Sequence, residues 1–212
     1  MKAILNLVLV LSLVSCSPDK VPTYNQILAT GNLRENGYSN DYFKFKITIP
    51  RNWLVLNKEE IEERNSMGLE LISESVDISD TTSNKQPKFL ININKYRQAA
   101  QEALQGNAGF QISFLKKQYF SNETELTFIT KARELLVSVP YYKNTSEIDR
   151  IEIGGKDFRT FTSEVHFKGY IVTQQNYVLD INDCFLLIDI SYRGDFVKPE
   201  LERIIRSIEF YE

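Results

Sequence analysis

The stretch DFRTFTSEVHFKGYIVTQQNYVLDINDCFLLIDISY, residues 157–192, decides the fold of this chain. With the residues just before it, it divides into four runs of extended pattern: 145–153, 157–167, 170–181 and 184–192. The connections between them are short, and their residues tolerate the positive φ of tight hairpins: Gly154-Gly155, Lys168-Gly169 and Asn182-Asp183. The pattern therefore predicts an antiparallel meander.

A helix is expected on each side of this meander in the sequence. After Pro199, an apolar stripe at helical spacing should lie on the sheet: Leu201, Ile204, Ile205 and Ile208. Before the meander, Asn122 with Glu125 is expected to cap a second helix, which Pro140 ends. The apolar face of that helix is Leu126, Ile129, Ala132 and Leu136.

The first half of the domain adds strands and one more helix. Residues 43–49 alternate apolar and polar side chains, which predicts a half-buried strand that Pro50 ends. Asn57 and Glu60 form a capping box for a helix from Lys58 to about Met67. Further expectations are strands at 69–75 and 88–96 and a short helix at 97–105, whereas 107–120 fits a strand or a helix equally. The fold class is therefore α+β, an antiparallel sheet flanked by helices.

Two short strings carry a resemblance to a known family. YFKFKITIPRNW, residues 42–53, resembles the opening strand and P-x-x-W turn of PsbP-like domains, whose fold is shared with the nuclear transport factor Mog1. IEIGGKDF, residues 151–158, is similar to their G-G-K hairpin, and the closing strand and helix at 184–210 fit as well. The resemblance implies a PsbP-like α-β-α sandwich. It also implies a family that acts chiefly by binding partner proteins, and it transfers no catalytic residue.

The N-terminus carries a targeting signal. Lys2 and the apolar run 3–14 are followed by Ser15 and Cys16, and this ending resembles the lipobox of bacterial lipoproteins. The resemblance implies cleavage between Ser15 and Cys16 and a diacylglyceryl group on the Cys16 sulfur. Two acyl chains anchor a protein stably, whereas one chain holds it only marginally. The apolar run is shorter than the roughly 17–25 residues of a membrane-spanning helix.

The lipobox divides the chain into three parts. Residues 1–15 are the predicted signal peptide, 16–40 the lipidated cysteine and a polar tether, and 41–212 the PsbP-like domain. Within the tether, Thr23 and Gln26 could cap a short helix. The expected location is the bacterial cell envelope, lipid-anchored to a membrane, which is the outer membrane if the source is Gram-negative.

Composition excludes several classes of function. The chain has 25 Lys and Arg against 28 Asp and Glu, a net charge of −3, which argues against a nucleic-acid partner. A single histidine and one cysteine besides Cys16 exclude a His-based or Cys-based metal cluster. No sequence motif for a cofactor or for a catalytic nucleophile is present. We therefore expect no catalytic, cofactor-binding or metal-binding residues.

A few residues still invite a chemical interpretation. His166 with Glu164 could act in acid–base chemistry, although their alternation on a strand favours a solvated face. Cys184 shares its face with apolar residues, which favours a packed core thiol. Four glutamates on the 58–67 helix are better explained by a solvated helix start than by calcium. Tyr141-Tyr142 and Tyr119-Phe120 could be exposed interface anchors, although packing is favoured for both.

Three functional hypotheses remain. The first is a lipid-anchored, non-catalytic cell-envelope domain that binds a partner protein. The second is a carrier or sensor of a small apolar ligand held between sheet and helices, and an aromatic-lined cavity would favour it. The third, an enzyme that uses Glu164 and His166, needs a concave polar pocket around that pair.

Overall fold

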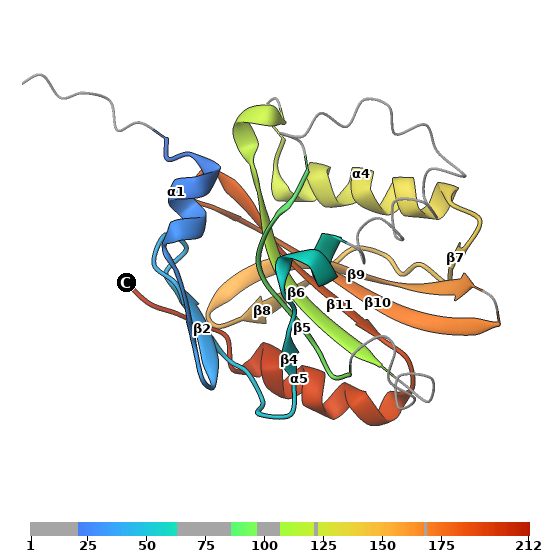
Figure 1. Ribbon diagram of the computed structural model, residues 1–212. Coiled ribbons are helices and arrows are strands. Elements are labelled where there is room, and N and C mark those ends of the chain that lie inside the picture. The colour runs from blue at the N-terminus through green and yellow to red at the C-terminus, as the bar shows by residue number, and fades with distance from the viewer. Residues whose placement is uncertain (1–20, 63–85, 97–106, 121–122, 168) are drawn as a thin grey trace, which may run out of the picture.

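The computed structural model describes residues 21–62, 86–96, 107–120, 123–167 and 169–212 (Figure 1). Its centre is an 8-stranded antiparallel sheet in the order β4-β5-β6-β11-β10-β9-β7, in which β8 also pairs with β9. The strands are β4 (Leu54–Val55), β5 (Lys88–Asn94), β6 (Ala108–Lys116), β7 (Tyr142–Lys143), β8 (Asp149–Ile153), β9 (Lys156–Phe167), β10 (Tyr170–Ile181) and β11 (Cys184–Tyr192).

The predicted meander is confirmed as β8 to β11. Its turns are tight because their residues adopt positive φ: Gly154 and Gly155 at 58° and 79°, and Asn182 and Asp183 at 50° and 57°. The register Ile181↔Cys184 brackets the second of these turns and runs unbroken to Thr173↔Tyr192. The α+β class predicted from the sequence is therefore correct.

The N-terminal region differs from the expected tether over residues 16–40. The capping box at Thr23 is confirmed, with Gln26 N 3.3 Å from Thr23 Oγ1, and it begins α1 (Tyr24–Ala29). After α1 come β1 (Gly31–Arg34) and β2 (Gly37–Asn40), which join a 4-stranded sheet in the order β1-β2-β3-β12. The remaining strands of this sheet are β3 (Phe45–Thr48) and β12 (Glu209–Phe210). The tether prediction is wrong for residues 24–40.

A single buried side chain explains much of that error. The Asn40 side chain is fully buried, and its Oδ1 accepts hydrogen bonds from the backbone N–H of Tyr42 and of Phe43, both at 3.1 Å. Ile27 of α1 is also fully buried. In sequence, a polar residue that organises a turn resembles a residue of a flexible linker, so the pattern predicts a tether where the chain is folded.

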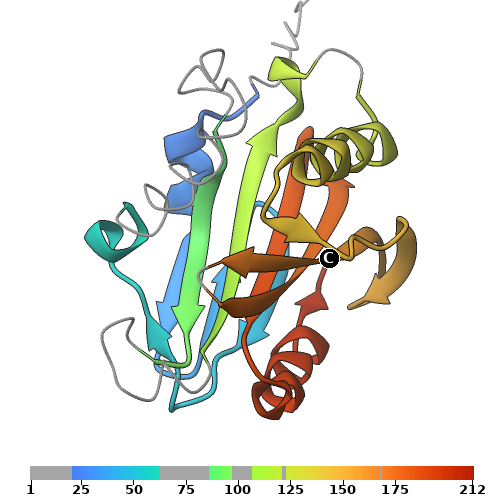
Figure 2. The same ribbon diagram turned by 90° about the vertical axis from the view of Figure 1, so that its right-hand side faces the viewer.

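The two faces of the central sheet are covered differently. The small sheet, α1 and α5 (Lys198–Arg206) pack on one face, called the α5 face below, where they enclose the main apolar core. Helix α4 (Glu125–Ser138) packs on the other, the α4 face, over a smaller cluster of Leu115, Ile129, Phe161, Val178, Phe185 and Leu187. Figure 2 shows the sheet between the two layers. The expected helices on both faces are confirmed.

Helix α4 starts later than predicted. Its N-cap is Thr124, whose Oγ1 accepts a hydrogen bond from Thr127 N at 3.2 Å, and not Asn122. Ile129 is fully buried, but Leu126 is exposed, because only a narrow stripe of the helix meets the sheet. Strand β6, with the 3₁₀ turn Lys117–Tyr119, resolves the ambiguous region 107–120. In β6, Phe110, Ile112 and Phe114 alternate with Gln111 and Ser113, but Leu115 breaks the pattern, so the alternating run is short.

Part of the remaining predictions can be compared with the structure. Residues 58–62 are helical, and the Asn57–Glu60 capping box is present with hydrogen bonds of 2.9 and 3.0 Å. The rest of the 58–67 helix, the strand at 69–75 and the helix at 97–105 lie outside the described residues, as do Ser15 and Cys16.

Candidate functional site

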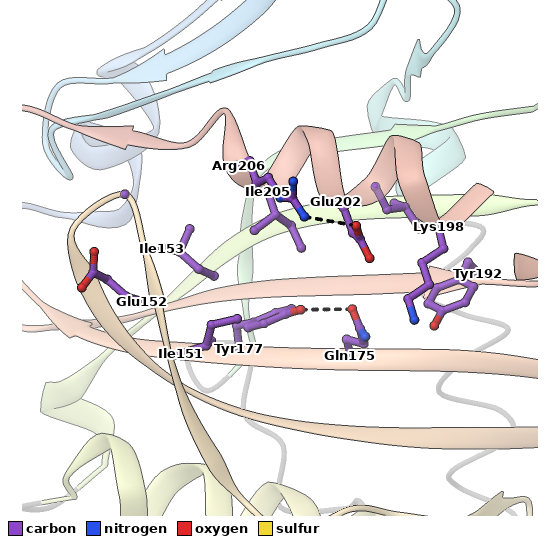
Figure 3. Close-up of a pocket in the computed structure, with 12 residues that line it drawn as sticks. Ile151, Glu152, Ile153, Gln175, Tyr177, Tyr192, Lys198, Glu202, Ile205 and Arg206 are labelled. Carbon is purple, nitrogen blue, oxygen red and sulfur yellow. Dashed lines mark hydrogen bonds and ion pairs between the residues drawn. The ribbon is translucent and has the colours of Figure 1, made fainter. Parts of the chain in front are cut away.

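A cleft of about 520 Å³ lies between α5 and the β8–β9 hairpin (Figure 3). Tyr177 and Gln175 of β10 and Tyr192 of β11 line its floor on the α5 face. Its walls are formed by Ile151, Glu152, Ile153 and Gly154 from the hairpin and by Lys198, Leu201, Glu202, Ile205 and Arg206 from α5. A cleft of this size falls within the range of small-molecule and side-chain binding sites.

The helical wall follows directly from the sequence pattern of α5. Leu201 and Ile204 are buried in the main core, as is Ile208 just after the helix. Ile205 lies at the edge of this stripe and is only partly buried, so it packs against the core and also lines the cleft. The predicted stripe is thus confirmed in its position, and two of its four members, Leu201 and Ile205, line the cleft as well.

A partly buried ion pair fixes the start of α5. Lys95 Nζ lies 2.8 and 2.7 Å from the two carboxylate oxygens of Glu200, and Trp53 Nε1 donates to Glu200 Oε2 at 2.9 Å. Burial by itself would raise the pKa of Glu200, but the hydrogen bonds from Lys95 and Trp53 outweigh it and lower that pKa. Because the carboxylate stays ionised, α5 is held at a fixed place along the sheet.

A glycine closes one end of the cleft. Gly154 has φ of 58°, and a Cβ added there would lie 2.6 Å from the Ile208 carbonyl oxygen and 3.1 Å from the Phe210 ring. The hairpin turn can approach the chain after α5 this closely only because no side chain intervenes. The G-G turn therefore positions the cleft wall as well as reversing the chain.

The lining combines an apolar interior with a charged rim. The Tyr177 hydroxyl donates to Gln175 Oε1 at 3.0 Å. Burial, followed by the neighbouring Tyr192 and Glu202, raises the pKa of Tyr177 to about 12, so the phenol stays protonated at neutral pH. At the rim, Arg206 lies 3.4 Å from Glu202, and both side chains are largely exposed. These groups can bind an apolar or aromatic group flanked by charge.

The lining lacks two of the residue types that often take part in catalysis. It contains no histidine or cysteine. Among the described residues, no group of three or more His, Cys, Asp or Glu could hold a metal ion. The arrangement is suited to binding.

The pair His166 and Glu164 lies elsewhere on β9 and does not line the cleft. His166 Nε2 is 2.9 Å from Glu164 Oε2, and Asn144 Nδ2 donates to the same oxygen at 2.7 Å. The bond with His166 and then that with Asn144 lower the pKa of Glu164. Both side chains are about one third exposed, at 39% and 33%, so the predicted strand face is a partly solvated one.

The remaining candidates from the sequence are packed residues. Cys184 is fully buried, and burial raises the pKa of its thiol to about 11, which agrees with a core thiol. Phe120 packs edge-on against Phe128 and Phe185. The Tyr119 ring stacks on Tyr24 with centroids 6.2 Å apart. Within the described residues, no helix has the length and apolarity needed to cross a bilayer.

Sequence reasoning did not single out the cleft. The one useful signal in the sequence was the pair Gln175 and Tyr177, a polar and an aromatic residue on one face of a strand. Further along the strand, the same face carries the apolar residues Leu179 and Ile181. The hairpin wall could not be located from sequence, because its position depends on the approach of Gly154 to the chain after α5.

Comparison with known proteins gives structural similarity only. The sequence matches no protein-family model and no curated protein. The structure is similar to cyanobacterial PsbP (CyanoP) of Synechocystis sp. PCC 6803, with a TM-score of 0.46 and 12% identity over 84% of this chain and 95% of that one. It is also similar to LpqN of Mycobacterium tuberculosis, a protein involved in cell envelope biogenesis, with a TM-score of 0.46 and 11% identity over 79% and 83%.

A protein of unknown function from Pseudomonas aeruginosa gives a TM-score of 0.44 and 12% identity over 60% of this chain and 85% of that one. All three TM-scores lie below 0.5, and no functional residue is transferred from these proteins.

Proposed function

We propose that this protein is a lipid-anchored, non-catalytic domain of the bacterial cell envelope that binds a partner protein through the cleft beside α5. The observation that carries the proposal is the cleft itself, which has tyrosine and aliphatic side chains inside and an exposed mixed-charge rim. Buried aromatic contacts surrounded by a polar rim are typical of the centres of protein–protein interfaces.

The exposed wall of the cleft supports a macromolecular partner. Ile151 on β8 is 42% exposed although it lies beside the cleft. An exposed isoleucine next to Tyr177 leaves apolar surface in water, and a partner side chain would cover it. A lipid on Cys16 would hold the domain in the cell envelope, which raises its effective concentration toward a partner in the same compartment.

A pair of isoleucine variants tests the proposal. Ile151→Asp places a charge in the cleft wall, whereas Ile171→Asp changes a similarly exposed isoleucine, 52% exposed, on β10 outside the cleft. Crosslinking pull-down from native membranes identifies the partner, and calorimetry with the purified partner then measures affinity. We expect at least tenfold weaker binding for Ile151→Asp and unchanged binding for Ile171→Asp. Equal affinity of the two variants would contradict the assignment of the cleft.

The anchor has its own test. Cys16→Ser should leave an uncleaved or soluble precursor, and the control Cys184→Ser should leave membrane fractionation unchanged. Membrane retention of the Cys16→Ser protein after detergent-free washing would refute lipidation at this residue.

A second candidate function is the carriage of a small apolar ligand in the same cleft. The tyrosines of the floor, Tyr177 and Tyr192, favour it, because aromatic rings are common in small-molecule sites. The two functions differ in what fills the cleft. Native mass spectrometry of the lipidated protein, released from detergent micelles in the instrument, would show an added small-molecule mass in the second case and the lipidated polypeptide alone in the first.

A further inference from the structure

The charged residues that line the cleft beside α5 do not all face its interior. Successive side chains of β8 point to opposite faces of the sheet, and Ile151 lies on the α5 face because it is opposite Phe158 of the main core. Glu152 therefore points to the other face, and Figure 3 shows its carboxylate directed away from Ile153. Among the described residues, the charges that face the cleft come from α5: Lys198, Glu202 and Arg206.

Two of these three charges neutralise each other. Arg206 lies 3.4 Å from Glu202, and the pair has no net charge. Lys198 is exposed, and within the described part of the chain no carboxylate lies at ion-pair distance from its amino group. Glu164 lies on the same face of the sheet, but its carboxylate is bonded to His166 at 2.9 Å. The described lining of the cleft thus carries one unpaired charge, which is positive.

Hydrogen-bond donors lie at the same end of the cleft as this cation. Gln175 on β10 and Tyr192 on β11 are diagonal neighbours on the α5 face, because Tyr192 is opposite Thr173. The Tyr177 hydroxyl donates to Gln175 Oε1 at 3.0 Å, which leaves Gln175 Nε2 as a donor. Figure 3 shows Lys198 extending from α5 toward this part of the floor. This end of the cleft therefore offers an ammonium group, an amide N–H and a phenol hydroxyl.

A carboxylate beside an apolar group matches this arrangement. An ionised carboxylate only accepts hydrogen bonds, and its bonds with an ammonium group are strong because both are charged. From Lys198, α5 advances about 4.5 Å to Leu201 and about 10.5 Å to Ile205, which line the apolar part of the cleft. Alternate side chains of an extended chain are about 7 Å apart. A carboxylate and an apolar side chain two positions apart can therefore reach both parts of the cleft.

We infer that the cleft binds a partner segment in which an acidic residue stands two positions from a large apolar one. The inference rests on the function proposed for the cleft and names the chemistry of its partner. The carboxylate of the segment contacts Lys198 and Gln175, and the apolar side chain covers Ile151 and Tyr177. A basic residue in place of the acidic one would face Lys198, and like charges repel each other.

Three synthetic peptides that differ at one position test the inference. They are acetyl-Ala-Phe-Ala-Asp-Ala-amide and its Asn and Lys counterparts, whose capped ends carry no charge. NMR titration and calorimetry measure their affinities for the folded protein. We expect the Asp peptide to bind about threefold to tenfold more tightly than the Asn peptide, which has the same shape without the charge, and the Lys peptide to bind most weakly.

Variants of Lys198 test whether this residue is the source of the preference. Lys198→Met keeps the apolar stem and removes the charge, so it should bind the Asp and Asn peptides equally. Lys198→Glu should prefer the Lys peptide to the Asp peptide, which a damaged fold could not produce. The control Lys143→Met removes an exposed lysine of β7 that does not line the cleft, and it should keep the preference for Asp.

Several results would overturn the inference. Equal affinity of the unmodified protein for the Asp and Asn peptides would do so, as would a Lys198→Met protein that still prefers Asp, or the absence of saturable binding of the Asp peptide. Octanoate is the probe for a small acid in the same place, and tenfold tighter binding of octanoate than of the Asp peptide would assign the cation to such an acid.

Failure of this inference is distinguishable from failure of the proposed function. Ile151→Asp should weaken binding of the Asp and Asn peptides alike, because it changes the apolar wall. If those peptides bind equally and Ile151→Asp weakens both, the cleft binds its partner without a charge preference. Equal affinity of Ile151→Asp and Ile171→Asp for the purified partner would instead contradict the cleft as the binding site.

Discussion

The two faces of the central sheet follow different rules. On the α5 face, Phe110, Ile112 and Phe114 of β6 lie beside Leu186 and Ile188 of β11, and these side chains are almost completely buried. On the α4 face, the same two strands contribute Gln111 and Asp189, beyond a small apolar cluster. These residues of the α5 face are explained by stability alone. On the α4 face, polar side chains bond to one another across the strands, and Gln111 Nε2 donates to Asp189 Oδ2 at 3.2 Å.

The largest expected change in stability comes from truncating a buried side chain on the α5 face. Phe110→Ala should lower the free energy of unfolding by about 3–5 kcal/mol, because the ring is fully buried in the main core. Chemical denaturation measures the change. A loss below about 1 kcal/mol would mean that this face is less tightly packed than its burial indicates.

Within α5, two neighbouring positions should differ. Leu201→Ala should cost about 2–5 kcal/mol, since Leu201 is buried, whereas Ile205→Ala should cost roughly half as much, since Ile205 is only partly buried at the cleft. Denaturation curves of the two variants give the comparison directly. Equal losses would place Ile205 in the core and not in the cleft wall.

Truncating a buried polar side chain on the α4 face should have the opposite effect on stability. Ser113→Ala removes a buried hydroxyl without a partner, so it should be neutral or stabilise the fold by up to about 1 kcal/mol. The change is measured by thermal and chemical unfolding, with Ser146→Ala, whose hydroxyl accepts a bond from Thr162 N at 3.0 Å, as the control that should destabilise. A clear loss of stability in Ser113→Ala would show that its hydroxyl is bonded.

The smallest expected effect concerns the reactivity of the Cys184 thiol. Cys184 should resist a polar thiol reagent in the folded protein and react after denaturation, because its thiol is buried and its pKa is raised to about 11. Because burial raises the pKa of this thiol above its ordinary value of 9.0, the stability that the protonated thiol contributes is present below about pH 9 and is lost as the pH rises through about 11. Between about pH 9 and pH 11, the free energy of unfolding should therefore fall less for Cys184→Ala than for the unmodified protein. Rapid labelling at neutral pH would contradict the burial of this strand.

Sequence patterns predicted the fold best where each strand alternates or is bounded by turn residues. The meander and the Asn57–Glu60 cap were predictable for this reason. Strand β6 was less predictable, because its alternation covers only residues 110–114 and Leu115 interrupts it. The short strands β1 and β2 were missed because GNLR and GYSN contain few apolar residues.

The candidate sites were less predictable than the fold. Gln111, Asn176 and Asp189 are separated by 65 and 13 residues, and only the strand register places them opposite one another. Gln111 and Asp189 each lie between two apolar residues, so each appears as the solvated member of an alternating strand. The cleft likewise depends on the tertiary approach of Gly154 to Ile208, which no local pattern contains.

The folded part of the chain begins close to Cys16 in sequence, and this constrains how the domain would be oriented on a membrane. Pro22 already contacts the central sheet, since its carbonyl oxygen accepts a hydrogen bond from Lys116 Nζ at 2.5 Å. With a lipid on Cys16, the six residues from there to Pro22 reach at most about 20 Å. Strand β11 begins beside Lys116 and ends at Tyr192 in the cleft, and Figures 1 and 2 place α1 and α5 at opposite ends of the sheet. A connection this short would hold the end of the domain that carries α1 near the lipid. It would present the cleft on the far side, facing the aqueous space.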